Sequence, residues 1–344
     1  AVLPHVGRAT ILDTGSTDGT QDIVKATCDS FNTPLAFFEG NFIDYGTTRN
    51  EVLSLDRTSI ARPKVGEAVG TARFQLMLSG DEYISDGEKI AEELEKHLDD
   101  EIDLFVIKLA LEGKTMHPPR IFRSGSEWRY VKRVHEFPTN PNPDAKIGLI
   151  PGAAIEHVVS DSERRVKAIW EVHIPMLRED LEKNPEDTHA LMFLAQSYEE
   201  VLVTPAFDEE ERKHLAREAV ALRATRMCLP GEPTEKHFCM MHLIDSARVT
   251  GDYSPEQLYE LIEQHCETDP YRPDAALLRA QLAMTVKPMR VVYDLATHVL
   301  KVAETARSIV NTSTVDLNCV WQAHRIAAMC ARQMAAAFPN ERVD

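Results

Sequence analysis

The most informative pattern of apolar and polar positions lies near the start of the chain. Apolar residues 11–12 lead into a polar stretch, residues 13–20, with two acids, two glycines and four hydroxyl residues, and an amphipathic segment follows to about Cys28. This order predicts a buried strand, a polar loop with sharp turns at Gly15 and Gly19, and a helix. Ligands collect at such edges of α/β folds. The alternative is an ordinary Asx turn followed by a helix cap.

The second half of the chain shows helix-type periodicity only. Long amphipathic runs cover residues 162–183, 188–202 and 208–228, and helix pairs recur with a proline near their starts, as in residues 185–198 and 272–283. This spacing predicts stacked helical repeats, with a partial match to the tetratricopeptide pattern. Stacked helix pairs form a concave surface that commonly holds an extended peptide or mediates self-association. The alternative is that these helices only pack against the first domain.

The polar loop has the composition of a nucleoside site. It lacks the Lys-Ser/Thr ending of a P-loop and the three-glycine spacing of a dinucleotide-binding turn. Its carboxylates repel phosphate, but they accept hydrogen bonds from a base N–H or from ribose hydroxyls. A divalent metal is the usual way to neutralise the phosphates, and a second apolar run that ends at Asp81 offers a place for one. The predicted nucleotide contacts are Asp13, Gly15, Ser16 and Asp18.

Four motifs in sequence order resemble those of the family 2 glycosyltransferases that carry tetratricopeptide-like repeats. They are the loop at 11–20, the segment 41–50 that ends in Arg-Asn, the stretch 78–82 at the place of the family's Asp-x-Asp-Glu metal motif, and the block 120–136. The resemblance covers residues 1–160 closely. It implies a GT-A-like (Rossmann-like) α/β nucleotide-sugar domain, a UDP-linked donor, Mn²⁺ or Mg²⁺, and inversion at the anomeric carbon.

Two departures from the family pattern stand out. The family opens with a strand and a helix that this chain lacks, since residues 1–6 resemble the end of that helix. This predicts that an N-terminal strand is missing from the sequence and that the nucleotide pocket loses a wall. In addition, Ser79 stands where the metal motif has its first Asp, which weakens the expected metal affinity.

The resemblance assigns Asp81 and His157 as metal ligands. A metal held there would act as a Lewis acid on the departing diphosphate. His157 lies in a short apolar run, residues 154–158. The alternative for such a residue is a hydrogen-bonded core histidine.

The basic and aromatic block at 129–136 supplies the candidate catalytic residues. Glu136 is the predicted general base for the acceptor, and His135 is its rival, because its unperturbed pKa is near neutrality. Arg129 and Arg133 are predicted to compensate diphosphate charge. The alternative is an exposed strand with a solvated charged face.

Arg49 and Asn50 end the second motif and precede a helix-like stretch. They are predicted to contact the phosphate or the base of the donor. The alternative for Arg49 is an ion pair with a loop acid such as Asp13 or Asp18 that holds the fold together.

Charge and cysteine content narrow the range of partners and compartments. The formal charge of −17 disfavours an extensive nucleic-acid interface or an anionic membrane surface. A modified DNA base stays open as acceptor through the basic residues of 120–133. No apolar run approaches the length of a membrane span and no signal peptide is visible. The six cysteines show no paired spacing, which predicts free thiols in a reducing, cytoplasmic compartment.

The sequence thus predicts a GT-A-like domain over residues 1–160 and an all-α helical-repeat domain over residues 161–344. The expected activity is metal-dependent transfer of a hexose from a UDP-sugar to a hydroxyl or thiol on a protein, a glycan or a modified base. A protein or peptide acceptor would bind the repeats, which also suit a homo-oligomer. The alternative function is a non-catalytic helical-repeat scaffold with a degenerate, nucleotide-binding transferase domain.

Overall fold

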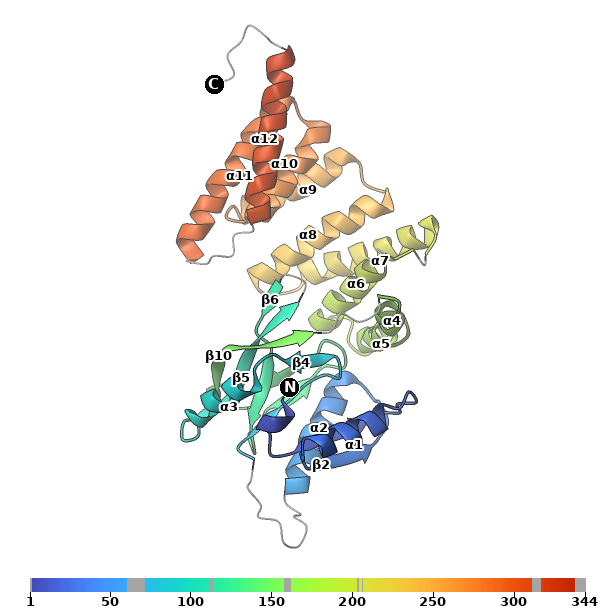
Figure 1. Cartoon of the computed structure of the whole chain (residues 1–344). Helices are drawn as coiled ribbons and strands as arrows, with labels where there is room; N and C mark the ends of the chain where they lie inside the picture. The colour runs from blue at the N-terminus through green and yellow to red at the C-terminus, as the bar shows by residue number, and fades with distance from the viewer. Residues whose placement is uncertain are drawn as a thin grey trace. The chain divides into compact units, whose positions relative to one another are not determined.

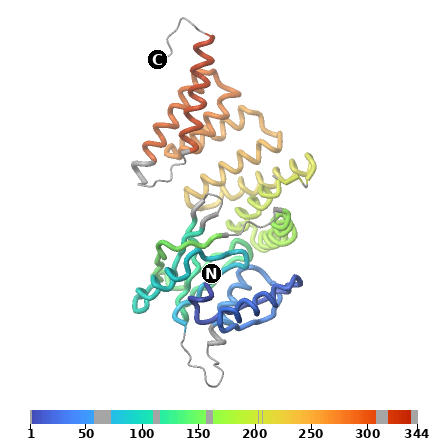
Figure 2. The backbone as a smooth tube through the Cα atoms, in the orientation of Figure 1, coloured from blue at the N-terminus to red at the C-terminus, as the bar shows by residue number. Residues whose placement is uncertain are grey.

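The computed structural model describes residues 2–60, 72–111, 114–157, 162–202, 204–205, 207–310 and 317–337 (Figure 2). The chain divides into two compact units, Ala1–Arg165 and Val166–Asp344. The first unit combines strands and helices, and the second is helical (Figure 1).

The N-terminal unit begins with a strand–helix–strand element. After a short 3₁₀ turn, β1 (Ala9–Asp13) pairs in parallel with β2 (Leu35–Glu39), and Ala9 lies opposite Leu35. The connection contains α1 (Thr20–Ser30). The polar loop therefore joins a strand to a helix, as the pattern of residues predicts.

The larger sheet of this unit is mixed, with strand order β3-β7-β5-β10-β4 and with β6 paired to β5. Only β5 and β10 pair in parallel among these strands as the structure describes them. The bounds are β3 Phe74–Leu76, β4 Glu82–Ile84, β5 Ile102–Leu111, β6 Lys114–Met116, β7 Pro119–Arg123 and β10 Lys146–His157. Burial of apolar side chains stabilises one face, where Phe105, Ile107, Ile121 and Ile155 are fully buried.

A second hydrophobic cluster of the N-terminal unit lies around Leu53, Leu104, Phe122 and Tyr130. It joins α2 (Tyr45–Ile60) to β8 (Arg129–Val131), which pairs with β9 (Phe137–Thr139). α3 (Gly87–Glu95) contacts β10. The structure therefore does not show a GT-A Rossmann domain. A Rossmann sheet is a continuous parallel sheet, whereas β1 and β2 form a separate pair and the larger sheet is mainly antiparallel.

The C-terminal unit is a succession of helices, each in contact with the next along the chain (Figure 1). The run 162–183 is one continuous helical stretch with a π-helical turn at Ile169–His173. The other helices match the helix-type periodicity of the sequence, so the helical-repeat part of the predicted fold is confirmed. The helices are α4 Ser162–Ala168, α5 Ile174–Lys183, α6 Thr188–Leu202, α7 Glu209–Cys228, α8 Pro233–Thr250, α9 Pro255–Thr268, α10 Pro273–Val286, α11 Met289–Val310 and α12 Leu317–Ala337.

Small residues allow these helices to approach closely. Ala216, Ala247, Ala275 and Ala283 are fully buried in the packing of the helices, together with larger side chains such as Ile244. None of the helices, over the residues that the structure describes, combines the length and the apolar character needed to cross a bilayer.

Candidate functional site

The loop after β1 is organised by the carboxylate of Asp13. This buried carboxylate accepts hydrogen bonds from the backbone N–H of Ser16, at 3.2 and 3.3 Å, and from the amide of Gln21, at 2.7 Å. The hydrogen bonds from Ser16 are the main cause that lowers the pKa of Asp13. Gly15 adopts φ of 112°, which an L side chain rarely adopts. Asp13 therefore fixes the shape of its own loop.

Asp18 lies at the start of α1, on the exposed side of the loop. Its carboxylate accepts hydrogen bonds from the backbone N–H of Thr20, at 3.1 Å, and from the Thr20 hydroxyl, at 2.6 Å. These bonds lower the pKa of Asp18. Since Gly19 is the N-cap and supplies no side chain, Asp18 takes the capping role.

Arg49 is the centre of a half-buried polar network in the N-terminal unit. Its guanidinium forms an ion pair with Glu136 and donates a hydrogen bond to the Ser79 hydroxyl at 3.0 Å. It also lies 5.5 Å from the ring centre of Tyr130. Burial acts to lower the pKa of Arg49, but the charge and hydrogen bond of Glu136, together with the charges of Tyr130 and Glu82, outweigh it, so the pKa is raised. The structure thus brings the predicted base and the predicted donor arginine into direct contact.

Asn50 locks helix α2 to strand β8. Its side-chain amide donates to the carbonyl oxygen of Tyr130 and accepts from the Tyr130 backbone N–H, both at 2.8 Å. Both ends of the amide are therefore used within the protein, and Asn50 holds the backbone of the block at 129–136 in place.

Glu82, and not its exposed neighbour Asp81, is the buried acid of the predicted metal motif. Its carboxylate accepts from Arg120 at 2.6 Å and from the Ser79 backbone N–H at 2.9 Å, and its side chain is 3% exposed. Strand pairing places the backbone of His157 opposite Glu82. The side chain of His157 lies outside the described residues.

Arg129 and Arg133 of the basic block both take part in hydrogen bonds that involve the backbone. Arg129 is exposed and donates to the carbonyl oxygen of Trp128 at 2.6 Å. The carbonyl oxygen of Arg133 accepts from the backbone N–H of Tyr45 at 3.0 Å. His135 is exposed and adopts φ of 52°, so this turn of the chain is tightly constrained.

The C-terminal unit contains a groove of about 650 Å³ between α10 and α12. On α12, side chains at positions 322, 325, 329 and 332 share one face of the helix. The floor is crossed by a hydrogen bond from the Gln281 amide to the Gln322 carbonyl oxygen at 2.8 Å. Residues of the groove include Gln281, Met284, Gln322, Arg325, Met329 and Arg332. None of these residues is among the site residues predicted from the sequence. The only sequence signal for them is the helical spacing that places positions 322, 325, 329 and 332 on one face.

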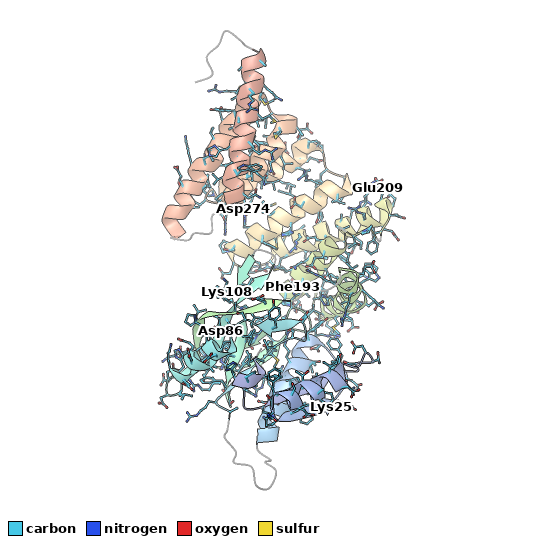
Figure 3. All side chains as sticks on the ribbon, in the orientation of Figure 1. Lys25, Asp86, Lys108, Phe193, Glu209 and Asp274 are labelled. Atoms are coloured by element: carbon cyan, nitrogen blue, oxygen red, sulfur yellow. The ribbon has the colours of Figure 1, made fainter. Side chains whose placement is uncertain are left out.

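A chain of titratable groups, in which both histidines are buried, lies elsewhere in the same unit. His237 contacts His265 through ring nitrogens 2.8 Å apart, and its other nitrogen lies 2.8 Å from the carboxylate of Asp274, labelled in Figure 3. Burial, followed by the charge of His237, lowers the pKa of His265. The folded protein therefore disfavours the charged form of His265.

This arrangement predicts that the C-terminal unit loses stability in mild acid. Below the ordinary histidine pKa of about 6.5, the unfolded chain binds a proton that the folded His265 does not. Above that pH, His265 is neutral in both states and does not reduce the free energy of unfolding. As the pH falls below it, the free energy of unfolding falls by up to about 1.4 kcal/mol for each pH unit. Urea unfolding followed by circular dichroism at pH 7.5 and 5.5 measures it. We expect His265→Asn to reduce the pH dependence and His298→Asn, at an exposed position of α11, to leave it unchanged. An equal pH dependence of the stability in the wild type, His265→Asn and His298→Asn would contradict the prediction.

Comparisons with known proteins give only distant structural matches. No family model and no curated protein matches the chain. Solved structures that match include MamA, at 8% identity and TM-score 0.32, over 53% of this chain and 98% of MamA. PilF of Pseudomonas aeruginosa matches at 16% identity and TM-score 0.23, over 52% and 91%. The type IV pilus biogenesis factor PilW matches at 14% identity and TM-score 0.23, over 53% and 95%. At these TM-scores the matches carry no argument about activity.

These findings correct the family assigned from the motifs. No family model matches, and the three structures named are not those of glycosyltransferases. The described residues also contain no group of three or more His, Cys, Asp or Glu side chains that could hold a metal ion. The assignment to the family 2 glycosyltransferases is therefore wrong, a GT-A fold is not shown, and nothing in the comparisons or the described residues supports a UDP-sugar or a manganese site. Short polar loops and acid pairs recur on unrelated folds, so their order along the chain was insufficient. Catalytic activity, a cofactor and the roles given to single residues stay predictions from the sequence.

Proposed function

We propose that this chain is a helical-repeat scaffold whose C-terminal unit binds a partner polypeptide. This is the alternative function that the sequence analysis set beside the transferase. The observation that carries the proposal is the groove between α10 and α12, whose lining combines apolar and hydrogen-bonding side chains.

The lining of the groove has the features of a peptide site. Met284 is 43% exposed, and Met329 offers a second flexible thioether, so the apolar part adapts to different side chains. The amide pair of Gln281 and Gln322 offers further hydrogen-bonding atoms at the floor. Helical-repeat proteins commonly bind extended segments along such surfaces.

Selection from a phage-displayed library of random dodecapeptides on the full chain tests the proposal. We expect one or more enriched peptides that bind the wild type. Ala328 is exposed and lines the groove, so Ala328→Glu is expected to block entry and weaken binding at least tenfold. The matched control is Ala336→Glu, at an exposed position of the same helix outside the groove, which should bind like the wild type.

Two results would overturn the proposal. One is a selection that enriches no peptide on a folded chain. The other is an enriched peptide whose binding Ala328→Glu and Ala336→Glu change equally, because the groove would then not be the binding surface.

A further inference from the structure

We infer that the groove between α10 and α12 binds an extended peptide segment with two acidic residues three positions apart and an apolar residue between them. This inference rests on the proposed function and adds the chemistry of the partner. It follows from three features of the groove, which are its charge, its free amide atoms and the spacing of its arginines.

The groove is cationic on a strongly acidic protein. Its charged lining residues are Arg325 and Arg332, and no described lining residue is acidic. Both guanidiniums are exposed, and neither has an ion pair within the part of the chain that the structure describes. Arg325 also lies 4.7 Å from the ring centre of Trp321, which is 56% exposed, and this contact restricts the motion of the guanidinium. The planar guanidinium of arginine can donate two parallel hydrogen bonds to one carboxylate. Carboxylate side chains are therefore the complementary ligand.

The amide pair at the floor favours a peptide backbone over an isolated anion. The bond from Gln281 to Gln322 uses one N–H and one carbonyl oxygen. The Gln281 carbonyl oxygen and the Gln322 amide hydrogens then remain for a ligand, and neither side chain has another partner among the described residues. One acceptor and one donor side by side match the N–H and C=O of an extended backbone.

The spacing of the arginines fixes the spacing of the acids. Arg325 and Arg332 are seven residues apart on α12, which corresponds to about 10.5 Å along the helix axis. A peptide in the extended polyproline II conformation rises about 3.1 Å per residue and repeats every three residues, so side chains three positions apart lie on one face and span about 9 Å. Between the two arginines lie Ile326 and Met329, which are half-buried and apolar. At least one of the two residues between the acids is therefore expected to be apolar.

Fluorescence anisotropy with the full chain and a labelled peptide, Gly-Ser-Gly-Asp-Ala-Leu-Asp-Gly-Ser-Gly, tests the inference. We expect saturable binding that weakens at least tenfold when both Asp residues become Asn, when Leu becomes Ser, or when the two Asp residues are made adjacent. Arg325→Ala and Arg332→Ala are each expected to weaken binding at least fivefold. The control is Arg290→Ala on α11, an exposed arginine outside the groove, with no expected change.

The outcomes separate the inference from the proposed function. The library could enrich peptides that lack paired acids. If Ala328→Glu weakens their binding but Arg325→Ala and Arg332→Ala do not, the inference is overturned and the proposed function stands. A library that enriches nothing would overturn both. Self-association of the chain that Ala328→Glu abolishes would make a second copy the occupant, and this would also overturn the inference.

Discussion

Replacing Arg223 by Ala is expected to destabilise the C-terminal unit by about 3–5 kcal/mol, because it breaks a buried ion pair and leaves one charge without its partner. Arg223 lies on α7, its side chain is fully buried, and its guanidinium donates two hydrogen bonds to Glu199, at 2.8 and 3.0 Å. Glu199 also contacts His242 at 3.1 Å. Loss of Arg223 therefore disturbs the packing of α6, α7 and α8 together.

The same helix offers a matched control for this substitution. Arg217 forms a similar two-bond pair with Asp252, at 2.7 and 3.0 Å, but both side chains are about half exposed, at 45% and 47%. Arg217→Ala is expected to cost no more than about 1 kcal/mol. Urea unfolding followed by far-ultraviolet circular dichroism measures both variants. Equal stabilities of the two variants would show that burial does not determine the strength of the Arg223 pair.

Replacing Gly46 by Ala is expected to destabilise the N-terminal unit by about 3 kcal/mol, although Ala is ordinarily the better helix former. A Cβ at this position of α2 would lie 2.3 Å from the carbonyl oxygen of Lys132. The turn at Lys132 and Arg133 has little freedom to move, because Lys132 adopts φ of 72°. In addition, the Arg133 carbonyl oxygen accepts a hydrogen bond from the backbone N–H of Tyr45. Helix α2 must therefore shift and lose the backbone bonds of Asn50.

Fluorescence of Trp128 reports on this unit selectively. Trp128 is buried in the N-terminal unit, whereas Trp170 and Trp321 belong to the other unit and can be replaced by Phe. The control is Gly80→Ala, where a Cβ would meet nothing within 4 Å, with an expected change within about 0.5 kcal/mol. A Gly46→Ala protein as stable as the control would show that the loop yields to the methyl group.

Several elements of the fold could be predicted because their signals are local. Helix α1 begins at Thr20 after a glycine and an acid, and α10 has Pro273 in its first turn. At the start of α7, Asp208 and Glu211 form a reciprocal capping box through bonds of 2.9 Å. Each of these features depends on residues within four positions of one another, so a single sequence contains the information.

The candidate site of the N-terminal unit was harder to predict, because the partner of a polar side chain lies far along the chain. The sequence predicts a ligand contact for Asn50, and the structure adds that its amide bonds to the backbone of Tyr130, eighty residues away. Asp81 and Glu82 are neighbours in the sequence, and only packing against Arg120 determines that Glu82 is the buried one. Residue type and spacing predict that such side chains are polar, but not which atoms they bind.

The sequence by itself determined that the C-terminal unit is helical and where α6 and α7 begin and end, since helical periodicity, caps and prolines act over a few residues. Only the tertiary structure decided which charges are buried and where the groove lies. Burial of Arg223 depends on Glu199 from another helix, and the groove depends on α10 and α12, whose paired glutamines are 41 positions apart. Local hydrogen bonds follow from local sequence, whereas contacts between distant side chains follow from how complete helices pack.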